Sequence, residues 1–351
     1  MTGEALLTVD GLVTKFDAAD GVVHAINGVS FDIRPGETLG VVGESGSGKS
    51  VTMMSLLGLI PSSVGRIAAG TARYRATSGE VDLLKLSERQ FGRIRGREIG
   101  MVFQDPISSL NPVMTVGRQI AESLQRHLGL GRRESRSRAI EMLARVGIAD
   151  PSHRVDDYPH EFSGGMRQRV MIAIALAAGP RLMIADEPTT ALDVTVQAQI
   201  MALVRELQAE SELAVIWVSH DLGVVAGLAD RVLVMYGGTI VESAGVDDLF
   251  ENPQHPYTRG LLASIPGTGL AGSRLASIPG TPPSLQHELK LCPFADRCSH
   301  AIDRCARERP GLTPISADHS SACFWDIDAS RQRDGVAVAI QPMLAATRPS
   351  D

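Results

Sequence analysis

The sequence has 351 residues, of which 44% are hydrophobic and 21% charged, so we expect a soluble protein with one large domain and a smaller appendage. The net charge of −6 argues against a general nucleic-acid binder, which would carry a basic face, and no nucleic-acid partner is expected. No apolar run reaches the ~18 residues that span a bilayer, and residues 1–5 show no secretory signal, so a cytoplasmic location is predicted.

An α/β architecture is predicted between about residues 5 and 245, where short apolar runs alternate with amphipathic helices. Residues 6–34 and 66–84 favour an N-terminal antiparallel β portion. The other apolar runs are nearly uninterrupted, which is typical of strands that are buried on both faces of a sheet. These predicted strands are Leu39–Val42, Ile99–Phe103, Leu182–Ala185, Ala214–Val218 and Val232–Met235.

Two regions depart from this alternation. Between about residues 105 and 165, the segments Thr115–His127 and Arg133–Val146 predict a helical insertion. After Asn252, repeated prolines such as Pro253 and Pro256 break regular structure and predict an irregular extension. We therefore expect a main domain over residues 1–250, an extension over residues 251–330 and a flexible tail over residues 331–351.

A phosphate-binding loop is predicted where the first buried strand leads into a helix that runs through Leu57. The segment Gly43–Ser50 fits the pattern G-x-x-x-x-G-K-[ST] in the strand and helix context that this motif requires. Its amides can surround a phosphate at a helix N-terminus, Lys49 can reach the β- and γ-phosphates, and Ser50 can ligate Mg²⁺. A glycine-rich turn that only connects the two elements is the alternative. The predicted nucleotide contacts are Gly43, Glu44, Ser45, Gly46, Ser47, Gly48, Lys49, Ser50 and Val51.

Two acidic residues follow a second apolar strand, Leu182–Ala185. Asp186 at the strand tip can hold the Mg²⁺ shell, and Glu187 can polarise the attacking water as a general base. Taken alone, such a pair is equally explained by solvated acids at a strand end. The phosphate loop elsewhere in the chain favours the catalytic interpretation.

The segment Phe162–Arg169, which reads Phe-Ser-Gly-Gly-Met-Arg-Gln-Arg, is followed by a predicted helix over Val170–Ala178 and resembles the signature of ABC ATPases. Other motifs of that family occur in its order along the chain. They are Phe16 as the aromatic that stacks on adenine, Gln104 as the Q-loop glutamine, Ala191–Asp193 as the D-loop and His220 as the switch histidine. The resemblance covers residues 5 to about 245, and it makes residues 1–250 an ABC ATPase domain whose helical subdomain spans about residues 105–165.

The resemblance implies roles for these residues. Gln104 would sense Mg²⁺ and the attacking water, and His220 would bind the γ-phosphate and orient Glu187. Taken singly, a glutamine or histidine at a strand end is more often only a satisfied polar group. Ordinary packing likewise remains the alternative for Phe16.

The resemblance also implies that ATP lies between two ATPase domains placed head to tail. Ser163 and the amides of Gly164 and Gly165 would contact the γ-phosphate that the opposite subunit holds, and Asp193 would act across the interface. Many signatures of the family end in glutamine where this chain has Met166. A weaker anion or water contact is therefore expected there, with the contacts of Ser163 and the backbone retained.

Two further stretches, Phe103–Pro112 and Asn252–Leu262, resemble the peptide and nickel uptake branch of the family. This resemblance implies uptake of oligopeptides or dipeptides at the cytoplasmic face of a bacterial membrane, with nickel or another solute as the alternative. It favours a heterodimer with a second ABC ATPase subunit. The other implied partners are two transmembrane permease subunits and an extracytoplasmic peptide-binding protein. An exporter and a soluble ABC ATPase acting on ribosomes or DNA are the competing hypotheses.

The four cysteines lie together at Cys292, Cys298, Cys305 and Cys323, and in a reducing cytoplasm this clustering favours a metal or cluster site over disulfides. Their wide spacing suits a [4Fe–4S] cluster better than Zn²⁺, whose sites usually contain a closer pair. The extension also resembles that of peptide-importer ATPases, in which such a cysteine set recurs. Zinc, free thiols and alternative ligands at His300 and His319 remain open.

Overall fold

Two β-sheets stack on one another in the computed structural model, which describes residues 4–190, 192–265 and 277–336. The first sheet is antiparallel, with strand order β2-β1-β4-β5, and it confirms the antiparallel portion predicted near the N-terminus. Its strands are β1 (Leu7–Ala18), β2 (Gly21–Ile33), β4 (Gly65–Ala76) and β5 (Gly79–Asp82).

The second sheet has eight strands in the order β11-β12-β10-β9-β3-β8-β7-β6. Its five strands from β9 to β6 run parallel, and they confirm all five buried strands predicted from the sequence. The strands of this sheet are β3 (Thr38–Val42), β6 (Ile99–Val102), β7 (Leu182–Asp186), β8 (Ala214–Ser219), β9 (Arg231–Tyr236), β10 (Thr239–Gly245), β11 (Thr313–Pro314) and β12 (Ser320–Ser321).

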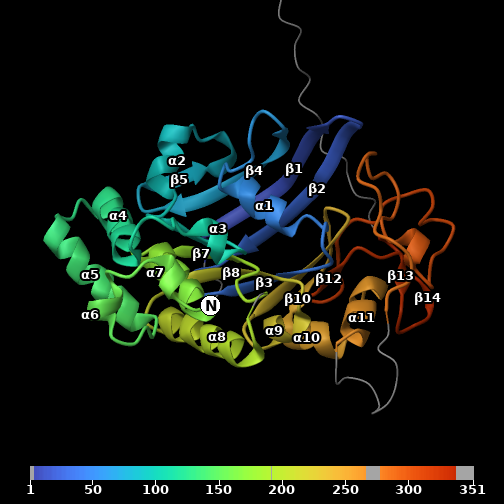
Figure 1. Ribbon diagram of the computed structural model, residues 1–351. Helices are drawn as coiled ribbons and strands as arrows, with labels where there is room; N and C mark the ends of the chain where they lie inside the picture. Colours follow the sequence, from blue (N-terminus) through green and yellow to red (C-terminus); the bar gives the residue numbers. More distant parts are fainter. Residues whose placement is uncertain (1–3, 191, 266–276, 337–351) are drawn as a thin grey trace, which may run out of the picture.

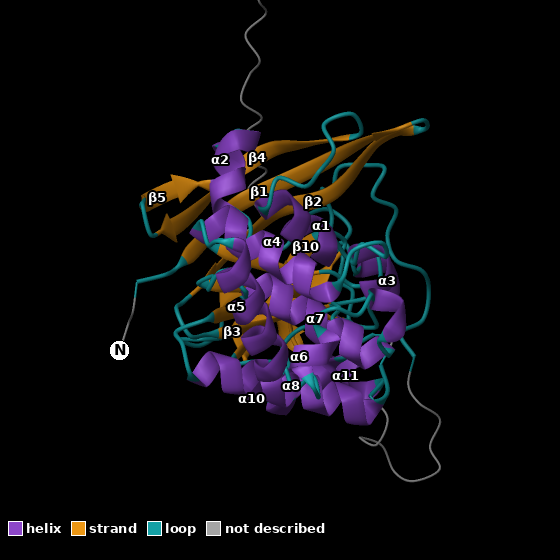
Figure 2. Ribbon diagram, turned by 60° about the vertical axis from the view of Figure 1, so that its left-hand side comes forward, coloured by secondary structure: helices purple, strands orange, loops and turns teal. Residues whose placement is uncertain are grey.

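The uninterrupted apolar strands are explained by a core on each face of the larger sheet. On β8, Ile216 belongs to the core between the two sheets, while its neighbour Trp217 belongs to the core on the opposite face. Met53 of helix α1 (Lys49–Leu56) fills the first core and Val170 of helix α7 (Gly164–Leu176) fills the second. Both faces of each central strand are therefore covered, as parallel sheets require. Figure 2 shows the antiparallel strands on one side and helices such as α8 (Val194–Ala209) and α10 (Val246–Glu251) on the other.

The helical insertion is confirmed by α4 (Val116–Leu128) and α5 (Arg132–Arg145), which lie at one end of the molecule with α6 (Figure 1). Helix α4 begins where the side chain of Thr115 accepts the amide of Arg118, and it ends at Gly129, whose φ is 69°. No helix among the described residues has the length and apolarity needed to cross a bilayer. The remaining helices are α1 (Lys49–Leu56), α2 (Glu88–Ile94), α3 (Pro106–Ser109), α6 (Pro151–Arg154), α7 (Gly164–Leu176), α8 (Val194–Ala209), α9 (Leu222–Ala226), α10 (Val246–Glu251) and α11 (Pro256–Ala263).

The extension is more regular than predicted in two places. Pro256 begins helix α11 instead of breaking the structure, because proline fits the first helical position and the side chain of His255 accepts the amide of Tyr257. Residues 320 and 321 form β12, which pairs with β10 and so adds the extension to the edge of the larger sheet.

The end of the described chain also differs from the predicted tail. The pair β13 (Trp325–Asp326) and β14 (Arg331–Gln332) forms a short hairpin, and Val336 is buried against Cys305 and Phe324. Described structure therefore continues to residue 336. The rest of the tail predicted from residue 331 lies outside the described residues.

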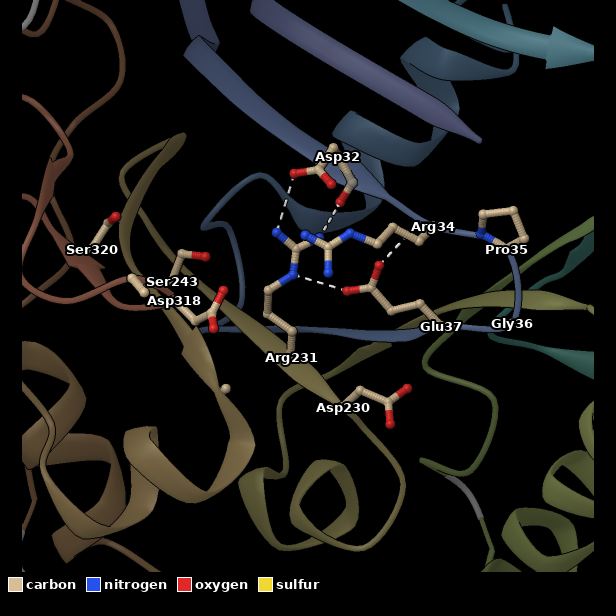
Figure 3. Close-up of a pocket in the computed structure, with 12 residues that line it drawn as sticks. Asp32, Arg34, Pro35, Gly36, Glu37, Asp230, Arg231, Ser243, Asp318 and Ser320 are labelled. Carbon is tan, nitrogen blue, oxygen red and sulfur yellow. Dashed lines mark hydrogen bonds and ion pairs between the residues drawn. The ribbon is translucent and has the colours of Figure 1, made fainter. Parts of the chain in front are cut away.

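A charged hollow of about 640 Å³ lies at the amino ends of β3 and β9. Figure 3 shows Arg231 of β9 between Asp32 of β2 and Glu37, with N–O distances of 3.2 and 2.9 Å. Burial by itself lowers the pKa of the Arg231 guanidinium. The carboxylates of Glu37 and Asp32 have the larger combined effect, and the pKa is raised. The ion pair with Asp32 joins the two sheets at the end of β3 that is opposite to the phosphate loop.

Candidate active site

The phosphate loop turns sharply between β3 and α1, and its glycines are required by that turn. Gly43 and Gly48 have φ values of 151° and 102°, in the region that other residues rarely adopt. A Cβ atom on Gly43 would lie 2.2 Å from the carbonyl oxygen of Met235. The backbone can therefore pass close to β9 only because position 43 has no side chain.

Lys49 is the first residue of α1, and its side chain is only 4% exposed. Its Nζ donates to the carbonyl oxygens of Gly43 at 2.8 Å and Glu44 at 3.1 Å, and it lies 4.0 Å from the carboxylate of Glu187. Burial lowers the pKa of Lys49, and the nearby acidic groups, Glu187 first among them, oppose this shift. The loop thus holds a cation near the predicted phosphate position.

The two acidic residues after β7 lie on the facing side. Asp186 accepts a hydrogen bond of 2.9 Å from the hydroxyl of Ser50, and burial raises its pKa. Glu187 has a φ of 47°, an unusual left-handed conformation for a residue other than glycine. Such conformations are frequent at functional sites because they direct a side chain to a particular place.

The carboxylate of Glu187 is held by side chains from three segments. Its Oε2 atom accepts hydrogen bonds from Gln104 at 3.1 Å and from Thr190 at 2.9 Å, and it lies 3.1 Å from Nδ1 of His220. Gln104 and His220 follow β6 and β8, the two strands that flank β7 in the sheet. Sequence reasoning missed Thr190, because a threonine three residues after an acid carries no distinctive signal.

Most of these groups, but not Asp186 or Thr190, line one cavity of about 450 Å³. It brings together the loop residues 45–51 with Gln104, Glu187 and His220, which are separated in the sequence but meet at the carboxyl ends of the parallel strands. Gly43 and Glu44 do not line this cavity, although both contact Lys49.

The other predicted contacts lie apart from this cavity. Ser163 caps α7 by accepting the amide of Met166, and Asp193 caps α8 by accepting the amide of Val196. Neither lines the cavity, and neither do Phe16, Gly164 and Gly165. Ala191, the first residue of the predicted D-loop, lies outside the described residues.

Comparison with known proteins identifies the family. Residues 26–190 match the model of the ABC transporter family, and residues 241–305 match the oligopeptide/dipeptide transporter C-terminal region. The chain is 51% identical over 322 residues to a probable peptide ABC transporter ATP-binding protein, y4tR, of Sinorhizobium fredii, covering 92% of this chain and 95% of that protein. The chain belongs to the ATP-binding proteins of ABC transporters. As a member of this family it is an ATPase subunit.

Further relatives of this ABC ATPase come from Bacillus subtilis. The chain is 48% identical to the dipeptide transport ATP-binding protein DppD, covering 92% of this chain and 95% of that protein. It is 50% identical to the oligopeptide transport ATP-binding protein OppD, covering 90% of this chain and 87% of that protein. Among solved structures, the ATP-binding cassette MJ0796, a dimer bound to ADP and Pi, matches 68% of this chain and 98% of its own with a TM-score of 0.60 and 28% identity.

The cysteines of this ABC ATPase gather in the extension. Cys292 donates its amide to the carbonyl of Cys305 at 3.1 Å, and their thiols share a hydrogen bond. The sulfur atoms of Cys298 and Cys323 each accept a backbone amide at 3.4 Å, from His300 and Trp325 respectively. Amides directed at sulfur favour a thiolate over a thiol.

The pKa is raised for three of these thiols, those of Cys292, Cys298 and Cys323. The hydrogen bond with Cys305 raises the pKa of Cys292, and burial raises the pKa of Cys323 to about 11. Of the alternative ligands, His319 is already bound to Glu242 at 2.7 Å, and the ring of His300 stacks on Trp325. Within the described residues, no group of three or more His, Cys, Asp or Glu side chains is arranged to hold a metal ion.

Proposed function

We propose that this ABC ATPase hydrolyses ATP at the cavity between the phosphate loop and Glu187, and that it thereby drives uptake of oligopeptides or dipeptides. The observation that carries the proposal is the cavity itself. It places Lys49 at the loop, the Glu187 carboxylate opposite, and Gln104 and His220 on that same carboxylate. This arrangement suits in-line attack of water on a γ-phosphate, where positioning and electrostatics supply most of the rate.

Each side chain has a role that its contacts support. Glu187 accepts the proton of the attacking water, while Gln104 and His220 fix its carboxylate. Lys49 gives up its carbonyl contacts to bind the β- and γ-phosphates. The hydroxyl of Ser50 and the carboxylate of Asp186, which lie 2.9 Å apart, are oxygen donors suited to Mg²⁺. Gln104, which lines the same cavity as Ser50, is the third proposed ligand. When bound, Mg²⁺ neutralises charge on the phosphates.

The remaining predicted contacts are assigned to the opposite subunit's nucleotide. Ser163, Gly164 and Gly165 lie at the start of α7, away from the cavity of their own chain. A helix N-terminus with free amides suits a phosphate that another subunit holds. We therefore propose a head-to-tail pair of ATPase subunits, with Asp193 at the interface, and a heterodimer as its form. Phe16 of β1 is proposed to stack on adenine.

The substrate class is proposed from the relatives and the extension. The relatives DppD and OppD are named for dipeptide and oligopeptide transport, and the extension matches the region that such transporters share. Two transmembrane permease subunits and an extracytoplasmic peptide-binding protein complete the proposed complex. This places the chain at the cytoplasmic face of the membrane. Nickel or another solute is the second candidate cargo, because the predicted uptake branch includes nickel transport.

Substrate-stimulated ATPase activity tests this proposal. The complex is assembled in membrane vesicles with its binding protein and assayed with a panel of dipeptides, longer peptides and a nickel chelate. We expect Mg-ATP hydrolysis to rise severalfold with one peptide class. Stimulation by the nickel chelate alone would contradict the peptide assignment, and absence of any Mg-ATP hydrolysis would contradict the ATPase site.

For the cysteines we propose a [4Fe–4S] cluster held by Cys292, Cys298, Cys305 and Cys323. The proposal rests on the chemistry of four cysteines in one short region, two of whose sulfur atoms receive backbone amides. In the described structure these thiols are not gathered into a metal site, so the cluster would draw them together. The cluster would cross-link a proline-rich segment that has little hydrophobic core of its own. Anaerobically purified protein should contain about four iron atoms and absorb broadly near ~400 nm. Stoichiometric zinc, or four reactive thiols without metal, would overturn this assignment.

A further inference from the structure

Arg297 of the extension contacts the phosphate loop. Arg297 lies in a short 3₁₀ turn, Ala295–Arg297, directly before Cys298. Its guanidinium forms a two-point contact with the carboxylate of Glu44, with N–O distances of 2.7 and 3.0 Å. The two residues are 253 positions apart in the sequence, and the arginine side chain is only 5% exposed. A paired, forked contact of this kind is strong and fixes orientation as well as distance.

The arginine has no spare hydrogen-bonding capacity. Besides its two bonds to Glu44, it donates to the hydroxyl of Tyr236 at 3.1 Å. The carbonyls of Pro279 and Ile278 accept its remaining bonds at 2.8 and 3.2 Å. All five N–H donors of a guanidinium are thereby used. This group is locked in place, and it cannot move without breaking several bonds.

A second residue of the extension holds the backbone of Glu44. The amide of Glu44 donates to the hydroxyl of Tyr257 at 2.8 Å, and Tyr257 is fully buried in α11. The ring of Tyr257 packs 4.5 Å from Tyr236 and 5.4 Å from Phe294, measured between centroids. Phe294 lies between Cys292 and Cys298, so the aromatic cluster joins the cysteine segment to the loop.

Glu44 in turn holds the catalytic lysine. Its carbonyl oxygen accepts Nζ of Lys49 at 3.1 Å and the amide of Ser47 at 3.2 Å. The amide, carbonyl and carboxylate of Glu44 are thus all bound, two of them by the extension and one within the loop. The carboxylate would also repel a nearby phosphate if the arginine did not neutralise it.

We propose that Arg297 and Tyr257 are positioning residues of the ATP site, through which the C-terminal extension fixes Glu44 and the geometry of the phosphate loop. The extension is then a working part of the nucleotide site in its own chain. This inference rests on the proposed assignment of the loop as the ATP site. It predicts that ATP affinity depends on contacts made more than 200 residues beyond the loop.

The test compares three variants of the full-length chain. Arg297→Gln should weaken binding of a fluorescent ATP analogue about tenfold, because it leaves the carboxylate of Glu44 unpaired and the loop unanchored. Tyr257→Phe, which removes one hydroxyl, should weaken it about threefold. Arg259→Gln is the matched control, because Arg259 pairs with Asp328 within the extension and makes no bond to the loop. Its affinity should equal that of the wild type.

Kinetics of the assembled transporter separate positioning from a general loss of structure. In Arg297→Gln the KM for ATP should rise while kcat stays within about twofold, as expected when ground-state and transition-state binding weaken together. Adding Glu44→Gln to Arg297→Gln should recover part of the affinity, because the unpaired carboxylate is then removed.

Two results would overturn the proposal. One is wild-type ATP affinity in both Arg297→Gln and Tyr257→Phe. The other is an equal loss in the control variant, which would indicate general damage to the extension. If Arg297→Gln does not fold, Tyr257→Phe decides the question, because it preserves the aromatic packing. A wild-type chain that binds no ATP would instead contradict the proposed ATP site.

Discussion

At the scale of single residues, Glu187 is the centre of the site. Its backbone is in a left-handed conformation, and its carboxylate is held by Gln104, Thr190 and His220. Holding one oxygen at three points fixes the direction of the carboxylate. A group that is already oriented needs no reorganisation free energy during the reaction, and such preorganisation is a main source of catalytic rate.

The substitution Glu187→Gln tests the assignment of the base. The amide keeps the shape and can still bond to its neighbours, but it cannot accept a proton from water. We expect kcat for ATP to fall by about 10²- to 10⁴-fold, with ATP binding retained and an ATP-bound pair of subunits accumulating. Single-turnover assays and size-exclusion chromatography with ATP measure both effects. Near-normal turnover in the assembled transporter would show that another group is the base.

At the scale of elements, helix α11 links the extension to the ATPase domain. Its start depends on His255, which is fully buried and accepts the amide of Tyr257 with Nδ1. Burial lowers the pKa of His255 to about 4, while Glu242 opposes this shift and Arg333 adds to it. The cap is therefore neutral at physiological pH.

This lowered pKa predicts a pH dependence of stability. The unfolded chain protonates His255 near its ordinary pKa of about 6.5, whereas the folded chain resists protonation down to about 4. The contribution of His255 is therefore fully present above pH 6.5 and is lost as the pH falls towards 4. Between pH 6.5 and 5 the loss should be about 2 kcal/mol.

Urea unfolding at pH 7.5 and pH 5 measures this effect in the wild type and in His255→Asn. Asparagine still accepts the capping bond but does not titrate, so the difference between the two pH values should shrink. Tyr257 remains in place in this variant and reports on the same helix. An unchanged difference would mean that other groups cause the acid sensitivity.

At the scale of the whole molecule, much of the fold could be predicted from local sequence. The strands around Val41 and Ile184 are apolar on both faces because both faces are buried, and that pattern is visible without a structure. The phosphate loop was recognisable because glycines at positions such as 43 and 48 are required by a tight turn. The acidic pair at the end of β7 followed from its place after a buried strand.

What could not be predicted depends on contacts between distant segments. Pro256 carries the same local signal whether it breaks a structure or begins a helix, and only the cap at His255 decides between the two. Likewise, nothing near Glu44 in the sequence indicates that Arg297 will neutralise it. Pairing of β12 with β10 was equally hidden, because two residues are too few to show a strand pattern.

Transport in a reconstituted system tests most directly whether this site powers uptake. Vesicles that contain the complete transporter with its binding protein are loaded with Mg-ATP, and accumulation of a radiolabelled dipeptide is followed. We expect accumulation with the wild-type chain, and at least about a hundredfold slower accumulation with Lys49→Ala, since that variant lacks the cation that binds the phosphates. Equal uptake by the two chains, or uptake that does not require ATP, would contradict the central claim that this site powers transport.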